Sequence, residues 1–244
     1  MARLLPVREA LLDAWAVISP TECSGCGTAD RAVCARCRLA LAPFVHATRR
    51  TAQNVSTEDS ITVLSALEYA GAAQRVIGAF KDGGRTDAAS VLAVPLLAAV
   101  VAALEHSGQP GGNDSGGAVR LATIPSSRQA MRSRGFKPVE LLMRRAGLRA
   151  SHVLGQTGEA ADQVGLDRVS RYLNKRGSLA ATRALDGYRF LLVDDIVTTG
   201  ATLFEARRAI TAGGGIVVGY ATLAETRRHY PDLISSQETR PQKL

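Results

Sequence analysis

Residues Phe190–Thr202 have the sequence FLLVDDIVTTGAT, which indicates the fold class of this chain. It opens with a continuous apolar run, Phe190–Val193, of the kind found in strands that are buried on both faces. Two adjacent carboxylates end this run, and a loop of threonines and a glycine follows them. Apolar side chains at helical spacing then predict an amphipathic helix over Thr202–Ala212. Because ligands bind beyond the carboxyl ends of the strands in an open parallel sheet, this arrangement predicts a ligand site.

The loop after the strand has the chemistry of a phosphate site. The first turn of a helix leaves backbone N–H groups without helical partners, and the helix dipole attracts an anion there. Gly200 lets the backbone approach that anion closely, and the threonine hydroxyls beside it add donors. Asp194 and Asp195 would repel a phosphate, so we expect them to face sugar hydroxyls, with Mg²⁺ nearby. These features describe a site for a ribose 5-phosphate; the alternative is a strand with an Asp-Asp turn and a capped helix.

Phe190–Thr202 resembles the signature of the type I phosphoribosyltransferases, which bind 5-phosphoribosyl 1-pyrophosphate (PRPP). The resemblance implies an α/β fold in which a central, mainly parallel sheet is flanked by helices. It implies that Asp194 and Asp195 bind the 2′ and 3′ hydroxyls of the ribose. It also implies that the 5′-phosphate is held by Thr198, Thr199, Gly200, Ala201 and Thr202.

Other segments resemble one branch of that superfamily, the ComF family, whose members often carry an N-terminal four-cysteine zinc module. The Arg-Gly-Phe motif of that family matches Arg134–Phe136. Its Gln…Leu…Arg…Asn pattern is supplied by Gln163, Leu166, Arg171 and Asn174. The chain departs from the usual Arg-Gly-Phe-Asn-Gln at Lys137 and Pro138, which puts a polar role of those two positions in doubt. The resemblance runs from Cys23 to about Ala224.

The resemblance also implies where pyrophosphate binds. In type I enzymes the loop after the first core strand holds it, and by chain order this loop is Pro125–Gly135. We expect contacts from Ser126, Arg128 and Arg134, because guanidinium groups suit phosphate oxygens. The alternative is a solvated basic loop. Lys81 lies where the family keeps a lysine; its role is open, and an exposed lysine at a helix end is the plainer interpretation.

The resemblance also implies a flexible hood over the site, which by chain order is Gly155–Gly187, and the sequence allows a helix there over Asp167–Lys175. Gln163, Arg171 and Asn174 lie in this hood and could close on pyrophosphate or on the acceptor. The alternative is a polar surface helix.

The four cysteines all fall within Cys23–Cys37, as two Cys-x2-Cys hooks separated by seven residues. Each hook brings two thiolates onto one side of a metal, which is the geometry that tetrahedral zinc needs. Four sulfur ligands at Cys23, Cys26, Cys34 and Cys37 would make the site closed and structural. An iron–sulfur cluster and paired disulfides are the alternatives.

Alternating strand and helix patterns along the chain predict a parallel sheet with crossover helices. The expected strands are Ile61–Tyr69, Val119–Ile124, His152–Leu154 and Ile216–Leu223. The expected helices are Met1–Ile18, Ala72–Lys81, Asp87–Glu105 and Pro138–Ala146. The polar stretch Ala47–Ser60 predicts a linker or surface loop. The expected organisation is an N-terminal helix and zinc ribbon or knuckle over residues 1–46, a phosphoribosyltransferase-like domain over 47–226, and a loose tail over 227–244.

The composition, with 46% hydrophobic and 21% charged residues, is that of an ordinary soluble protein. The net charge of +8 favours phosphates, nucleic acid or anionic membranes as partners. The longest apolar stretch, Val91–Leu104, is short for a bilayer span and contains Pro95, so a buried helix is expected. Glu9 and Asp13 interrupt the N-terminal apolar run, so we expect no signal peptide and a cytoplasmic protein.

Two functions fit these features. The first is an enzyme that binds PRPP with Mg²⁺ and transfers phosphoribose to an unidentified acceptor, releasing pyrophosphate. The second is a non-catalytic sensor of PRPP or nucleotides, or a single-stranded DNA adaptor. The ComF resemblance links that second function to DNA uptake, natural transformation and competence proteins. Acceptor and oligomeric state are open at this point.

Overall fold

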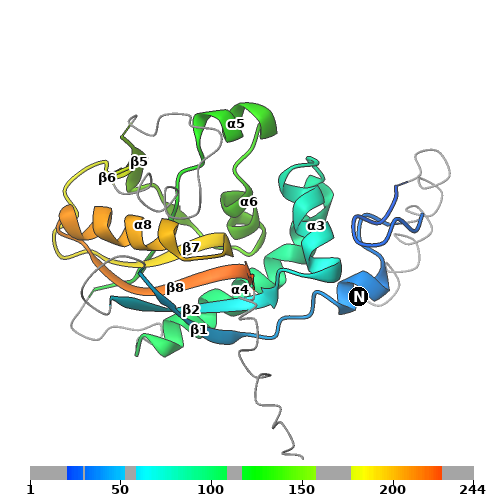
Figure 1. Ribbon diagram of the computed structural model, residues 1–244, viewed down its shortest axis with the longest axis horizontal. Coiled ribbons are helices and arrows are strands. Elements are labelled where there is room, and N and C mark those ends of the chain that lie inside the picture. The colour runs from blue at the N-terminus through cyan, green and yellow to red at the C-terminus, as the bar shows by residue number, and fades with distance from the viewer. Residues whose placement is uncertain (1–20, 30, 53–58, 109–116, 158–176, 227–244) are drawn as a thin grey trace, which may run out of the picture.

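The computed structural model describes residues 21–29, 31–52, 59–108, 117–157 and 177–226. Its centre is a six-stranded sheet with helices on both faces (Figure 1). In spatial order the strands are β1 (His46–Thr51), β2 (Ser60–Glu68), β8 (Ile216–Glu225), β7 (Arg189–Val197), β3 (Arg120–Thr123) and β4 (Ala150–Ser151). Every neighbouring pair is parallel except β1 with β2. The expected mainly parallel sheet flanked by helices is confirmed.

The apolar run at the start of β7 packs into the hydrophobic clusters on both faces of the sheet. Successive side chains of a strand point to opposite faces of the sheet. Leu191 and Val193 therefore join one apolar cluster, and Phe190 and Leu192 join the other. The first cluster is covered by α3 (Gly71–Lys81), α4 (Ala89–His106) and α6 (Pro138–Arg145), and the second by α8 (Ala201–Ala212).

Helix α4 is long and apolar enough to cross a membrane, the one such helix in the described part of the chain. Half of its most apolar window is buried inside the molecule. Leu92, Leu96 and Val100 are fully buried in the cluster that also contains Ala221 and Leu223 of β8. This packing explains the apolar run as the core-facing side of a crossover helix, as the sequence predicted.

The stretch Ala47–Ser60 was expected to be a linker or surface loop, but its first residues belong to strand β1, so that prediction is wrong over Ala47–Thr51. This strand runs antiparallel to β2, with Arg50 opposite Ile61. Arg50 is only 4% exposed and pairs with Glu225 of β8. The charged and threonine-rich sequence of β1 does not predict a strand, because an edge strand buries few apolar side chains and so lacks the apolar pattern of a central strand.

Two other predicted boundaries are also wrong. Strand β7 continues through the acidic pair to Val197, because β8 remains beside it as far as Glu225 and supplies backbone partners. The chain around His152 forms no single strand: Ala150–Ser151 ends the large sheet, and β5 (Leu154–Gln156) pairs antiparallel with β6 (Leu179–Ala181).

The remaining predicted elements are confirmed to within about two residues at most ends: β2, β3, β8, α3, α4, α6 and α8. The predicted helix at Met1–Ile18, the hood helix at Asp167–Lys175 and the tail from Arg227 lie outside the described residues.

The cysteine-bearing segment, which includes the short helix α2 (Ala35–Leu39), packs against α3 (Figure 1). Cys23, Cys37 and Leu41 belong to the same apolar cluster as Val76 of α3. Arg75 of α3 donates a hydrogen bond from Nε to the carbonyl of Gly25. Arg85, which follows α3, donates to the carbonyl of Glu22 at 3.0 Å. The segment is therefore docked on the main core rather than tethered beside it.

Candidate functional site

The candidate site lies where the parallel strands end. Strands β2, β8, β7 and β3 all run in the same direction, so their carboxyl ends meet at one edge of the sheet. Three segments leave that edge: the turn into α3 after β2, the threonine loop after β7, and the segment after β3 that enters α5 (Arg128–Arg134). Sequence-distant side chains on these segments are thereby brought together.

The threonine loop turns directly into α8. Gly200 is the residue that caps this helix, and its φ of 84° lies in the left-handed region that favours glycine. The Gly200 carbonyl accepts the Phe204 N–H at 3.0 Å, and the Ala201 N–H donates to Thr199 Oγ1 at 3.3 Å. Gly200 makes no side-chain cap to the first turn, and the positive end of the helix dipole there favours a negatively charged group.

The acidic pair lies within β7, just before this loop, and both aspartates are half-buried. Asp194 Oδ1 accepts the Asp195 N–H at 2.9 Å, and Asp195 Oδ1 accepts the Ile196 N–H at 2.7 Å. The other oxygen of Asp195, Oδ2, lies 2.6 Å from Nζ of Lys81. Lys81 is the last residue of α3, so the end of that helix reaches the acidic pair. Interpreting Lys81 as a merely exposed lysine was wrong.

The end of α3 also engages the Arg-Gly-Phe motif. Arg134 forms an ion pair with Asp82 at 2.8 Å. Phe136 packs edge-to-face against Phe80, with ring centroids 5.4 Å apart. The sequence Phe80–Asp82 therefore has one contact with β7 and two with the Arg-Gly-Phe motif.

The expected pyrophosphate loop is partly helical, which corrects the prediction of a loop throughout Pro125–Gly135. Ser127 caps α5 by accepting the Ala130 N–H at 3.1 Å, and Gly135 ends the helix with a φ of 72°. Arg128 is the first residue of α5, and Ser126 lies two residues before it. Arg134 lies in its last turn. The hood residues Gln163, Arg171 and Asn174 lie outside the described residues.

A buried ion-pair cluster lies behind the threonine loop, and sequence reasoning missed it. Glu225 accepts from Arg50 and from His46, each at 2.8 Å. A Cβ placed on Gly200 would lie 3.2 Å from Cβ of Arg50, so the arginine packs against the loop. Its position inside a predicted linker gave no signal of this role.

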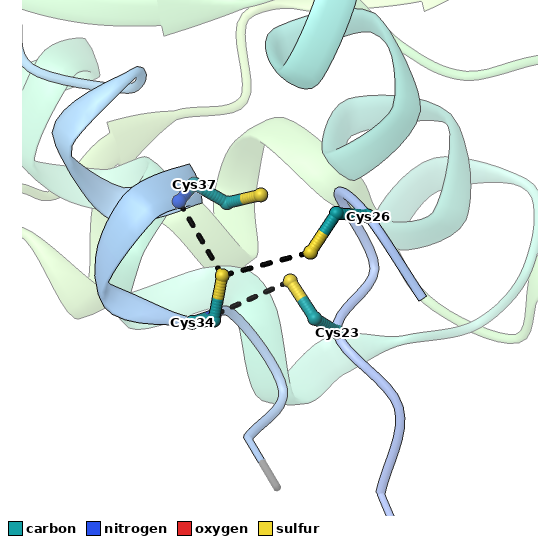
Figure 2. Close-up of side chains that lie close together, drawn as sticks. All are labelled: Cys23, Cys26, Cys34 and Cys37. Atoms are coloured by element: carbon teal, nitrogen blue, oxygen red, sulfur yellow. Dashed lines mark hydrogen bonds between the residues drawn. The ribbon is translucent and has the colours of Figure 1, made fainter. Parts of the chain in front are cut away.

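The four cysteines converge as their spacing predicted (Figure 2). Their sulfur atoms all lie within 4.8 Å of one another, and those of Cys26 and Cys34 are 3.7 Å apart. A tetrahedral zinc with Zn–S bonds of about 2.3 Å separates its sulfurs by roughly 3.8 Å. The four side chains are free thiols rather than disulfides. The donor set and its spacing therefore fit a closed tetrahedral zinc site.

Backbone N–H groups already point at these sulfurs. Cys34 N–H and Gly25 N–H donate to Cys23 Sγ at 3.3 and 3.4 Å, and Cys37 N–H donates to Cys34 Sγ at 3.5 Å. Burial alone would raise the pKa of Cys23, but these N–H groups bring the pKa below its usual value. Such donors stabilise thiolates, the form in which cysteine binds a metal.

The thiols of Cys26 and Cys37 have pKa values shifted in opposite directions. A hydrogen bond with the Thr28 side chain lowers the pKa of Cys26 to about 6. Burial, followed by the neighbouring cysteines, raises the pKa of Cys37 to about 12. Four sulfurs this close repel one another too strongly to be ionised together without a cation among them. A bound metal ion would supply that positive charge.

Comparison with known proteins identifies a family domain that includes β7 and the threonine loop. Residues 139–241 match the family model of the phosphoribosyl transferase domain. This range contains β7, the threonine loop, α8 and β8, and therefore the acidic pair. With the observed sheet topology, the match gives the fold as that of type I phosphoribosyltransferases. A four-cysteine cluster compatible with a zinc module precedes it.

The similar curated proteins include orotate and adenine phosphoribosyltransferases. The orotate phosphoribosyltransferase of Campylobacter fetus subsp. fetus (strain 82-40) is 32% identical over 78 residues, 32% of this chain and 37% of that protein. The adenine phosphoribosyltransferase of Synechococcus sp. (strain CC9902) is 30% identical over 105 residues, 43% of this chain and 60% of that protein. The chain thus spans less than two thirds of the length of these curated relatives.

Among solved structures, the adenine phosphoribosyltransferase of Saccharomyces cerevisiae aligns with a TM-score of 0.36 and 14% identity. The alignment covers 79% of this chain and 89% of that one.

Proposed function

We propose that this protein binds PRPP at the sheet edge and transfers its phosphoribosyl group to an acceptor, releasing pyrophosphate. The observation that carries the proposal is the turn from β7 into α8. Here the acidic pair, the threonine loop and the left-handed Gly200 lead directly into a helix N-terminus. The match to the phosphoribosyl transferase domain supports the proposal, because it covers the same residues.

Each part of the turn has a proposed role. The loop Thr198–Thr202 holds the 5′-phosphate, with the α8 dipole and the threonine hydroxyls as the attracting groups. The carboxylates of Asp194 and Asp195 accept hydrogen bonds from the ribose 2′ and 3′ hydroxyls.

Mg²⁺ enters with PRPP as part of the substrate, because phosphate and carboxylate oxygens are the ligands this cation prefers. In the reaction the bond from C1 of the ribose to pyrophosphate breaks, and a bond from C1 to the acceptor forms. Positive charge develops on the sugar and negative charge on the leaving group. Ser126, Arg128 and Arg134 are proposed to stabilise the departing pyrophosphate, with Gln163, Arg171 and Asn174 closing over it. No nucleophilic side chain is required.

The cysteine module is proposed to bind one structural zinc and to form a unit over residues 1–46, ahead of a phosphoribosyltransferase-like unit over 47–226. The convergence of Cys23, Cys26, Cys34 and Cys37 supports the zinc. The presence of this module together with the contacts of the Arg-Gly-Phe motif supports assignment to the ComF family.

Pyrophosphate release tests the enzymatic proposal. The protein is incubated with PRPP and Mg²⁺ against a panel of acceptors that includes adenine and orotate, the bases in the relatives' names. Release that depends on an acceptor, and that is lost in the Asp194→Asn, Asp195→Asn double variant, supports transfer. PRPP binding without release from any acceptor points instead to a sensor.

A second candidate, binding of single-stranded DNA, is favoured by one observation. Exposed basic side chains recur along the segment from α5 to β4. They are Arg132, Arg144, Arg145 and Arg149. Such a surface attracts nucleic acid phosphates, and this protein would then act as an adaptor in DNA uptake.

The salt dependence of DNA binding separates this candidate from nonspecific attraction. Fluorescence anisotropy with a labelled single-stranded oligonucleotide is measured from about 50 to 200 mM salt. DNA binding that is still measurable at the highest salt concentration, and that weakens when Arg144 and Arg145 are both replaced by Gln, supports the adaptor function. Binding that is abolished by modest salt leaves only nonspecific charge.

A further inference from the structure

Lys81 and Asp195 form an ion pair at the candidate site. The ammonium and the carboxylate are 2.6 Å apart, and the side chains are only 23% and 14% exposed. A pair that is partly withdrawn from water interacts more strongly than the same pair on the surface. Asp195 therefore has a cationic partner within the protein, although its proposed partner is a sugar hydroxyl.

The position of Lys81 is fixed by its neighbours. Phe80 is 1% exposed and packs on Phe136, while Asp82 pairs with Arg134. A Cβ on Gly83 would lie 2.8 Å from the carbonyl oxygen of Ala79, so only glycine allows the chain to leave the helix here. These contacts hold the end of α3 at the acidic pair and leave the flexible side chain of Lys81 as the part that can move.

The chemistry of the two groups then suggests an exchange. Asp195 can accept a ribose hydroxyl only if Lys81 shares or gives up that carboxylate. PRPP carries a pyrophosphate group on the same sugar, and an ammonium group has three donors on a flexible stem. The substrate therefore brings both a donor for Asp195 and a new acceptor for Lys81.

We propose that Lys81 is a substrate-binding residue: it neutralises Asp195 in the empty site and donates to the pyrophosphate oxygens once the ribose occupies Asp195. The inference rests on the proposed PRPP site and adds one more residue that contacts the pyrophosphate group, which ribose 5-phosphate lacks. Removal of the ammonium weakens PRPP binding, because a charge-assisted hydrogen bond is lost. It does not weaken ribose 5-phosphate binding, because no ion pair has to be broken first.

The test compares two ligands on three proteins. PRPP and ribose 5-phosphate are titrated calorimetrically, at one fixed Mg²⁺ concentration, into the wild type, Lys81→Met and Lys137→Met. Lys137 is the matched control, because it pairs with Glu140 on α6 at 2.9 Å and is exposed. Lys81→Met should raise the Kd for PRPP roughly ten- to hundredfold and leave that for ribose 5-phosphate unchanged or lower. Lys137→Met should change neither.

Three results would overturn the proposal. Equal weakening of both ligands by Lys81→Met, with a lower melting temperature, would make Lys81 a structural residue. An unchanged PRPP affinity would remove it from the site. Failure of Lys81→Arg to recover part of the PRPP affinity would show that charge is not what the site uses. Absence of PRPP binding by the wild type would instead overturn the proposed function itself.

Discussion

The cysteine module collects its four sulfurs from a stretch of fifteen residues, whereas the sheet-edge site collects side chains from across the chain. Arg50 and Glu225, which pack behind the threonine loop, are 175 residues apart in sequence. The first region depends on local spacing and a metal, and the second on the pairing of strands. A local change should therefore disrupt the module, while the sheet-edge site should respond to changes in the core around it.

Loss of zinc is the change with the largest expected effect. Structural zinc supplies about 10–16 kcal/mol of apparent binding energy in zinc-finger peptides, and here it would offset four crowded thiols. Replacement of Cys37 by Ser should abolish zinc binding and lower the melting temperature, because Cys37 is also a core residue. Metal analysis of the purified protein should give one zinc per chain, and thermal unfolding followed by circular dichroism should show the loss of stability.

Ser24→Ala is the control for that substitution, since it lies between the ligands but supplies no sulfur. It should keep the zinc and most of the stability. Iron with visible absorbance, or two disulfides in the native protein, would contradict the zinc assignment.

Breaking the buried pair behind the loop should have the next largest effect. Arg50→Met leaves Glu225 buried without its arginine, which typically costs about 3–5 kcal/mol. Arg49→Met next to it removes an exposed side chain that bonds Ser60, and should cost less than about 0.5 kcal/mol. Urea unfolding of both variants measures the difference. Equal stabilities would show that the long-range pair does not hold the site together.

A side chain at Gly200 should have a smaller effect on stability and a local effect on binding. Gly200→Val combines a left-handed backbone with crowding against Arg50, and should cost about 2–3 kcal/mol. Gly147→Val is a matched control, because its φ is 75° and a Cβ there meets nothing within 4 Å. Only Gly200→Val should weaken PRPP binding. If both variants bind PRPP equally well, the phosphate does not sit at the α8 N-terminus.

The smallest expected effect tests how far the two regions are coupled through α3. Arg75→Met removes the hydrogen bond to the Gly25 carbonyl and should cost the module about 1 kcal/mol. Zinc transfer to a colorimetric chelator should become several times faster, while the Kd for PRPP changes less than about threefold. A much larger change in PRPP affinity would mean that the module sets the position of Lys81.

The two regions also differ in how far the sequence predicts them. The Cys-x2-Cys hooks determine a cluster by spacing alone, and the apolar run at Phe190–Val193 identifies a strand buried on both faces. The sequence cannot show that β7 continues through Asp194 to Val197, because that extension depends on hydrogen bonds to β8. The pairing of Lys81 with Asp195 likewise depends on where α3 ends in space.

Arg50 illustrates the same limit most clearly. Its strand reads HATRRT, which has none of the apolar alternation typical of a strand. It forms because β2 offers an open edge and because Glu225 provides a buried partner for the guanidinium. Glu225 lies 175 residues away along the chain, outside any local sequence window.

Calorimetric titration with PRPP and Mg²⁺ measures directly whether the turn from β7 into α8 binds PRPP. The wild type is compared with the Asp194→Asn, Asp195→Asn double variant, after melting temperatures have shown that both are folded. We expect saturable binding to the wild type with one site per chain, and binding at least tenfold weaker to the double variant. Equal affinity for both proteins would contradict binding at this turn.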